Sequence, residues 1–151
     1  MLADRFFEKG RAFLGVRYPF ICGAMTWVSD PGLVSAVANA GGFACLAGGN
    51  APVEVLRTQI TETRQLTDKP FGVNLIPLAP VYHDHLALVR EMACPYVVYA
   101  GLPRKKDLAA VQESGTKTMC FAATEATGRR MLDNEADALI IEGTADGGHV
   151  S

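Results

Sequence analysis

The chain has 151 residues, of which 49% are hydrophobic and 20% charged, and 14 Lys and Arg against 16 Asp and Glu give a net charge of −2. This composition suits one globular domain and excludes an intrinsically disordered chain, which is poor in apolar residues and strongly charged. A nearly neutral chain carries no electrostatic footprint for nucleic acid or an anionic membrane. The N-terminus shows no apolar targeting segment, and no run approaches the roughly 18 apolar residues of a membrane span. We therefore expect a cytoplasmic protein that binds neither nucleic acid nor a membrane.

Short apolar runs alternate with longer amphipathic segments along the chain. The runs resemble strands buried on both faces of a parallel sheet, and they cover Tyr18–Gly23, Phe43–Ala47, Phe71–Leu75, Tyr96–Tyr99, Lys117–Ala122 and Ala138–Glu142. The segments between them predict helices that begin after Ser29-Asp30, at Pro52, and near residues 82, 105 and 124. The pattern is six strands and five helices in alternation.

The spacing of these elements narrows the fold class to α/β. Strands that begin 21 to 28 residues apart suit a (β/α)8 TIM barrel or a doubly wound open sheet. A barrel needs at least about 200 residues, and the sequence stops at Ser151 with no helix covering the last strand. This favours one partial domain, residues 1–151, that supplies the first six strands of a barrel and lacks strands seven and eight. The predicted strand order is sequential, with every helix on the outer side.

A partial barrel would leave two sheet edges unpaired and part of its interior open. Apolar strands with open edges associate readily. We therefore expect to find the chain with the remainder of its barrel or as a homo-oligomer.

Cysteine and histidine placement gives no sign of a metal site. The four cysteines show no C-x-x-C spacing and lie in or beside apolar runs, which predicts reduced core thiols at Cys22, Cys45, Cys94 and Cys120. His83-Asp84-His85 could suggest metal binding, but no carboxylates with ligand spacing accompany it. We interpret this triplet as a solvated helix start and expect no metal.

Two of the loops that follow predicted strands, and the end of the third predicted strand, carry candidate ligand-binding residues. In parallel α/β folds, function gathers on such loops. Gly23-Ala24-Met25 would let a ligand approach the backbone, with Met25 and Trp27 forming an apolar surface, although a simple turn explains it too. Gly48-Gly49 allows positive φ, as do many ordinary turns. Asn74 places an amide at the end of an apolar run, and its hydrogen-bond partner is a ligand or a neighbouring loop.

The loop after the sixth strand is the most informative segment. Glu142 ends the apolar run, Gly147-Gly148 would let the backbone pass close to a planar or anionic ligand, and His149 follows. A histidine there could act as a general base near neutral pH. The alternative is a surface turn with an incidental histidine. Dinucleotide-binding and P-loop fingerprints are missing from the sequence.

The motifs together resemble one known family. Gly23-Ala24-Met25, Ala36–Phe43, Gly72–Leu75 and Glu142–His149, in this order, are similar to the nitronate monooxygenases, formerly called 2-nitropropane dioxygenases. Relatives of that family include the flavin-dependent enoyl-acyl-carrier-protein reductases. The resemblance covers nearly all of the chain from about residue 15. It implies a (β/α)8 barrel that holds FMN at the C-terminal face of its strands.

The resemblance also implies roles for individual residues. Asn74 would hydrogen-bond FMN, Glu142 stands where many members have a flavin-contacting Gln, and His149 would take the acidic proton beside a nitro group. The substrate would be a nitronate or nitroalkane, with dioxygen as oxidant. The remaining residues implied in FMN binding are Gly23, Ala24, Met25, Gly147 and Gly148.

Two alternatives remain open at this point. One is an enoyl-thioester reductase that uses NAD(P)H. The other is a non-catalytic barrel fragment, because in FMN barrels the phosphate commonly sits in loops after strands seven and eight. We therefore expect the full-length protein to be an enzyme and the isolated chain to be inactive.

Overall fold

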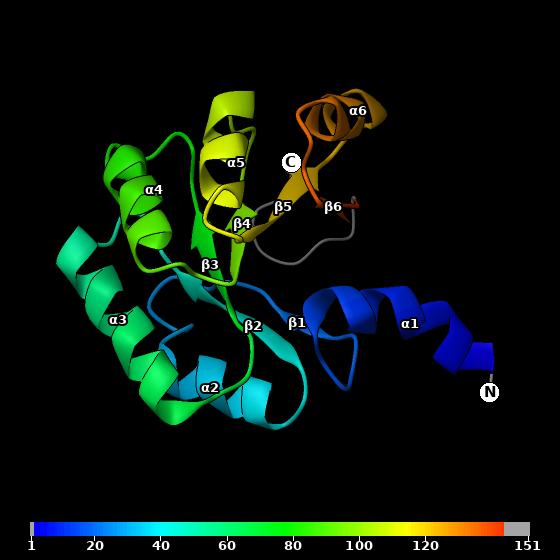
Figure 1. Cartoon of the computed structure of the whole chain (residues 1–151), viewed down its shortest axis with the longest axis horizontal. Helices are drawn as coiled ribbons and strands as arrows, with labels where there is room; N and C mark the ends of the chain where they lie inside the picture. Colours follow the sequence, from blue (N-terminus) through cyan, green and yellow to red (C-terminus); the bar gives the residue numbers. More distant parts are fainter. Residues whose placement is uncertain (1, 144–151) are drawn as a thin grey trace.

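The computed structural model describes residues 2–143 as a curled parallel sheet with helices around its outside (Figure 1). The strands are β1 (Ile21–Cys22), β2 (Phe43–Ala47), β3 (Gly72–Leu75), β4 (Tyr96–Tyr99), β5 (Lys117–Ala122) and β6 (Ala138–Ile141). The helices are α1 (Leu2–Leu14), α2 (Pro31–Asn39), α3 (Val53–Leu66), α4 (Tyr82–Glu91), α5 (Lys105–Gln112) and α6 (Glu125–Asp133). Among the described residues, no helix has the length and apolar character needed to cross a bilayer.

The strand order is β1-β2-β3-β4-β5-β6, and every neighbouring pair is parallel. This confirms the predicted sequential order and excludes a doubly wound sheet, whose strand order reverses at a switch point. Helices α2 to α6 lie along the outer side of the sheet, as right-handed crossovers require (Figure 1). The chain therefore forms six consecutive β/α units of a barrel.

The two faces of the sheet belong to two separate apolar cores. Alternate strand residues such as Leu46, Val73 and Val97 face outward into the core shared with the helices. The residues between them face inward, and they include Phe43, Cys45, Tyr96, Val98, Met119 and Ile140. Since side chains alternate along a strand, this two-sided burial explains why the strands are almost continuously apolar in sequence.

Helix α1 was not predicted, and its C-terminal end lies at the start of the inner face. The Tyr96 hydroxyl and the Lys117 ammonium group, at the first residues of β4 and β5, both donate to the Phe13 carbonyl oxygen, the latter at 2.8 Å. The Lys117 Nζ atom also lies 5.0 Å from the centre of the Phe13 ring. Leu14 is buried in the inner core. Helix α1 therefore closes the end of the sheet opposite the carboxyl ends of the strands.

Strand β1 is shorter than predicted. The apolar run Tyr18–Gly23 suggested six residues, but only Ile21 and Cys22 pair with β2. The Phe20 carbonyl oxygen still accepts from the Phe43 N–H at 2.9 Å, but the Phe20 N–H donates to the Tyr18 carbonyl oxygen, and the Tyr18 N–H donates to that of Gly41, which precedes β2. The regular ladder therefore begins only at Ile21. Phe20 is 73% exposed, so its apolar character does not mark a buried strand position.

Candidate functional site

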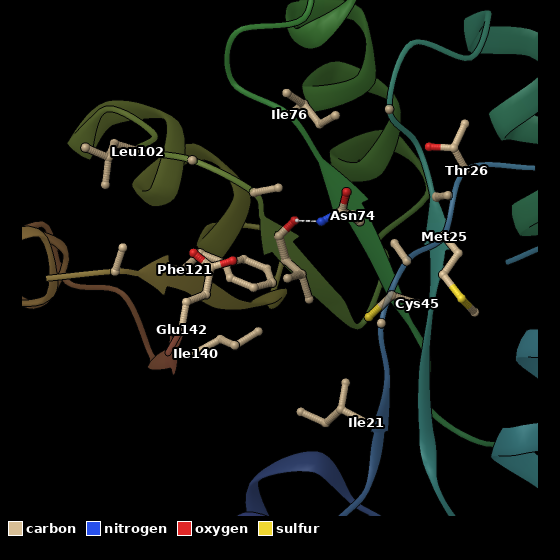
Figure 2. A pocket seen from close by; sticks show the side chains of 18 of the residues that line it. Ile21, Met25, Thr26, Cys45, Asn74, Ile76, Leu102, Phe121, Ile140 and Glu142 are labelled. Carbon is tan, nitrogen blue, oxygen red and sulfur yellow. Dashed lines mark hydrogen bonds between the residues drawn. The ribbon is translucent and has the colours of Figure 1, made fainter. Parts of the chain in front are cut away.

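The carboxyl ends of the strands surround a cavity of about 840 Å³. All six strands, or the loops directly after them, contribute to its lining (Figure 2). The lining includes Gly23, Ala24, Met25, Cys45, Ala47, Gly49, Asn74, Val98, Ala100, Gly101, Leu102, Phe121, Ile140 and Glu142. The volume lies within the range of about 300–1,000 Å³ that is typical of small-molecule sites. A site of this kind at the C-terminal face is where barrel enzymes place their chemistry.

Asn74 is the buried polar side chain on the inner face near the centre of this cavity. It is 9% exposed, and its Nδ2 donates to the Val98 carbonyl oxygen on β4 at 3.3 Å. Among the described residues, no hydrogen bond to the Oδ1 atom is formed, so this acceptor remains available. Figure 2 shows the amide between the wall that carries Met25 and the wall that carries Glu142. A buried amide that is satisfied on one side only is suited to hold a ligand with a hydrogen-bond donor.

The loop after β1 presents Gly23, Ala24 and Met25 to the cavity, as the sequence predicted. Ser29 holds this loop: its buried hydroxyl donates to the Gly23 carbonyl oxygen at 3.1 Å and accepts from the Met25 N–H at 2.9 Å. The sequence suggested Ser29 only as part of a helix cap, but the N-cap of α2 is Asp30. Trp27 is 93% exposed and is not among the described lining residues, so its predicted place beside Met25 is wrong.

The loop after β2 approaches the backbone of β3 closely. The Gly48 N–H donates to the Asn74 carbonyl oxygen at 3.0 Å, and a Cβ atom on residue 48 would clash with the same oxygen. Gly49 adopts a φ of +45° and lines the cavity. Residue 48 therefore has to be glycine because of the close backbone approach, and the positive φ of residue 49 favours glycine there. The sequence alone was equally consistent with an ordinary turn.

Glu142 lies on the opposite wall of the cavity, just after β6. Its N–H donates to the Ala122 carbonyl oxygen at 3.3 Å, which extends the β5–β6 pairing by one residue. Phe121 and Ile140 are paired in register on the same wall (Figure 2). The structure thus brings Gly23, Ala24, Met25, Asn74 and Glu142 to one cavity. The other three predicted site residues, Gly147, Gly148 and His149, lie outside the described residues.

Several lining residues were not singled out from the sequence. Cys45 and Phe121 are examples. Side chains alternate between the two faces of a strand, so the inward direction of Asn74 and Val98 in the neighbouring strands could have identified Cys45 and Phe121 as inward-facing too. Burial, with a smaller contribution from the nearby Cys22 thiol, raises the pKa of Cys45 to about 12. The Cys45 thiol therefore contributes an apolar, unreactive surface at neutral pH.

The interpretation of His83-Asp84-His85 as a solvated helix start is wrong for His85. His85 is 1% exposed, and its Nε2 lies 2.8 Å from the Ala51 carbonyl oxygen. The helical repeat explains this burial, because residue 85 shares the inner face of α4 with Tyr82, Leu86 and Val89. Across residues 2–143, no group of three or more His, Cys, Asp or Glu side chains is arranged to hold a metal ion.

Comparison with known proteins places these features in a family. A family model described as nitronate monooxygenase matches residues 8–98. A (3aS,4S,5R,7aS)-5-hydroxy-7a-methyl-1-oxo-octahydro-1H-indene-4-carboxyl-CoA dehydrogenase of Mycobacterium tuberculosis is 32% identical over 136 residues, which is 90% of this chain and 38% of the relative. A nitronate monooxygenase of Pseudomonas aeruginosa is 28% identical, over 98% of this chain and 52% of the relative.

A solved structure shows the same arrangement of elements. FabK from Thermotoga maritima superimposes with a TM-score of 0.90 at 36% identity, over 95% of this chain and 46% of FabK. The chain thus spans about half the length of this structure and between 38% and 52% of the two curated relatives. These similarities confirm the expected fold class, a partial (β/α)8 barrel. The chain belongs to the nitronate monooxygenase family.

Proposed function

We propose that the cavity holds FMN and that the protein is a flavin-dependent oxidoreductase that oxidises nitronates or nitroalkanes with dioxygen. The observation that carries this proposal is the half-satisfied amide of Asn74, buried in a mostly apolar cavity at the C-terminal face of the strands. Membership of the nitronate monooxygenase family supports the substrate class, and the match to a curated nitronate monooxygenase extends over 98% of this chain.

The residues present fit a flat heteroaromatic ring. Ala47, Gly49, Ala100 and Gly101 carry little or no side chain, so a planar group can approach the backbone on this side of the cavity. Met25 offers a polarisable thioether on one wall, and such sulfur atoms pack favourably against aromatic rings. The free Oδ1 of Asn74 is an acceptor for a ring N–H, which supplies the orientation that apolar packing alone cannot.

When bound, FMN supplies the redox chemistry, and the protein supplies position and electrostatics. Asn74 would orient the ring, and Gly23, Ala24 and Met25 would line the cavity beside it. Glu142 adds a carboxylate near the cavity, and a negative charge there opposes the build-up of further negative charge on the ring. We propose that Gly147 and Gly148 contact the cofactor through their backbone and that His149 takes the acidic proton next to the nitro group of a nitroalkane.

We further propose that residues 1–151 are the N-terminal part of a single barrel domain. The strands described here supply the ring-binding side of the cavity, and the grip on the phosphate would come from two further β/α units, as in other phosphate-binding barrels. The 151 residues on their own are then expected to be inactive.

A redox reaction on an acyl thioester is the second candidate function. The carboxyl-CoA dehydrogenase of Mycobacterium tuberculosis is 32% identical over 90% of this chain, a higher identity than that of the nitronate monooxygenase of Pseudomonas aeruginosa. That relative is named for an oxidation; the alternative is redox chemistry on a thioester in the reductive direction, an NAD(P)H-dependent reduction of an enoyl thioester. It uses the same cavity and cofactor and differs in the electron donor.

A paired steady-state assay distinguishes the two functions. The purified full-length protein is supplied in parallel with a nitronate and dioxygen, and with NAD(P)H and an enoyl-CoA. We expect dioxygen consumption that depends on the nitronate, with little oxidation of NAD(P)H. Oxidation of NAD(P)H that depends on the enoyl-CoA, without nitronate turnover, would replace the first function by the second.

A further inference from the structure

Two buried polar side chains of α4 form hydrogen bonds with the elements on opposite sides of this helix. Tyr82 and His85 stand three residues apart near the start of the helix and are 4% and 1% exposed. Each forms a hydrogen bond with an element that neighbours α4, His85 toward the loop after β2 and Tyr82 toward α5. Neither side chain lines the cavity that we assign to FMN.

His85 holds the loop after β2. A carbonyl oxygen only accepts hydrogen bonds, so the 2.8 Å contact with Ala51 means that Nε2 carries the proton. The other ring nitrogen, Nδ1, is buried and has no hydrogen-bond partner among the described residues. The contact with Ala51 is therefore the one hydrogen bond that the imidazole forms within this part of the chain. The loop is tied at its other end by the Gly48 N–H bond to Asn74, and between these two ties lies Gly49, which lines the cavity.

Tyr82 is linked to the loop after β4 through the ion pair of Asp107 and Arg104. Its hydroxyl donates to Asp107 Oδ2 at 3.3 Å, and the guanidinium of Arg104 donates to both Asp107 oxygens at 2.9 and 3.1 Å. Arg104 directly follows the loop of residues 100–103, which contributes Gly101 and Leu102 to the cavity. Gly101 has a φ of +128°, a conformation open to glycine alone, so this loop has one specific shape to be held in.

We propose that α4 sets the width of the cofactor cavity, with His85 and Tyr82 as positioning residues that each fix one of the loops on either side of Asn74. A purely structural role would stabilise the whole fold, whereas a positioning role affects one loop at a time. The part of the proposal that concerns FMN rests on the proposed function. The part that concerns the loops does not.

Amide hydrogen exchange of the purified full-length protein without added cofactor tests the loops directly. In His85→Leu, we expect the amides of Gly48 and Ala51 to exchange at least about fivefold faster, as loss of a buried hydrogen bond predicts. The amides of Ala100, in the loop after β4, and of Asp107 should be unchanged. In Tyr82→Phe, the opposite pattern is expected. Each variant thus serves as the control for the other, since global destabilisation would accelerate both groups of amides together.

Two further variants separate positioning from packing. His85→Gln keeps an N–H donor and should restore slow exchange at Ala51. Thr63→Val removes a buried hydroxyl that donates to the Gln59 carbonyl oxygen within α3, away from the cavity, and should change neither loop. Equal acceleration of both loops in His85→Leu and Tyr82→Phe, or no rescue by His85→Gln, would overturn the proposal.

Titration of the same variants with FMN tests the link to the cofactor. We expect the dissociation constant to rise about fivefold or more in His85→Leu and Tyr82→Phe, and to stay at the wild-type value in Thr63→Val. If wild-type protein binds no FMN, the proposed function fails while the exchange result still decides the role of α4. Unchanged FMN affinity in both variants, with wild-type binding intact, would show that the loops do not set the cavity and would overturn the inference.

Discussion

The N–H of Gly48 lies 3.0 Å from the carbonyl oxygen of Asn74, and the backbones approach so closely that no side chain fits at residue 48. A Cβ atom there would also contact the side chains of Leu75 and Leu56 at 3.4 and 3.5 Å. The contact fixes the loop after β2 against the end of β3. The position of the Asn74 amide and the shape of the adjacent cavity wall therefore depend on a glycine.

Substitution of Gly48 by Ala should destabilise the protein by about 1–3 kcal/mol, because the added methyl group has to displace the backbone of β3. Denaturant unfolding of the full-length protein measures this change. Gly23→Ala is the matched control, since an added Cβ there meets no atom within 4 Å and should leave stability close to that of the wild type. Equal stability of the two variants would contradict the close approach.

Replacement of Asn74 by Leu should weaken FMN binding by about ten- to hundredfold, because an orienting hydrogen bond of about 1–3 kcal/mol is lost inside an apolar cavity. Fluorescence titration with FMN gives the dissociation constant. Asn39→Leu is the control: the Asn39 amide also donates to a carbonyl oxygen, that of Leu66, but on an exposed surface away from the cavity. Unchanged affinity in Asn74→Leu would remove this residue from the site.

Asp107 should make stability depend on pH on the acid side. Burial acts to raise the pKa of its carboxyl group, but hydrogen bonds and the charge of Arg104 outweigh burial, and the pKa lies below its usual range. The unfolded-state pKa is about 3.9, so this contribution is fully present above that value and is lost as the pH falls through the lower folded-state pKa. Unfolding followed between neutral pH and about pH 2.5 measures the loss.

Asp107→Asn should remove this component and flatten the decline in stability below about pH 4. Glu91→Gln is the comparison variant, and it should change the decline of stability at acidic pH much less than Asp107→Asn does. The Arg57 guanidinium, mainly through a hydrogen bond, holds the pKa of Glu91 below its usual range too, but this pair is exposed and screened by solvent. An acid transition of Asp107→Asn identical to that of the wild type would show that the Arg104–Asp107 pair does not contribute.

Most of the barrel could be predicted from the sequence because each β/α unit leaves the same local pattern, an apolar run followed by an amphipathic segment. A strand buried on both faces, such as Val97 between inward-facing Tyr96 and Val98, appears as an apolar run, and regular spacing sets the order of the strands. Helix α1 is amphipathic, so its local pattern was present in the sequence and was overlooked. Its packing partner could not be predicted, because Phe13 is held by residues of β4 and β5, more than 80 positions away. No local pattern encodes such a contact.

Site residues could be predicted where their polarity differs from that of the neighbouring sequence, and not where it is the same. An amide in an apolar strand identified Asn74, but Cys45 and Phe121 look like any core residue and reach the cavity only through the curl of the sheet. His85 was misinterpreted because its neighbours His83 and Asp84 are exposed, while the helical repeat turns His85 inward. Positioning residues of this kind need the tertiary structure to be recognised.

His149→Ala, in the full-length protein, should slow turnover of a neutral nitroalkane by roughly 10²–10⁴-fold, as is typical when a general base is lost. A pre-formed nitronate has already given up its proton, so its turnover should be affected far less. Steady-state rates for both substrates, in wild type and variant, give the comparison. Equal losses on both would assign His149 to binding rather than proton abstraction, and no loss on either would remove it from the mechanism.

The visible absorption spectrum of the full-length protein, purified from its native host without added cofactor, tests most directly whether the cavity is a flavin site. We predict the two absorption bands of an oxidised flavin, a chromophore whose mass after release by heat is that of FMN, and a lower content of bound flavin in Asn74→Leu. A colourless protein that does not take up FMN when titrated would contradict the flavin assignment and with it the proposed oxidoreductase function.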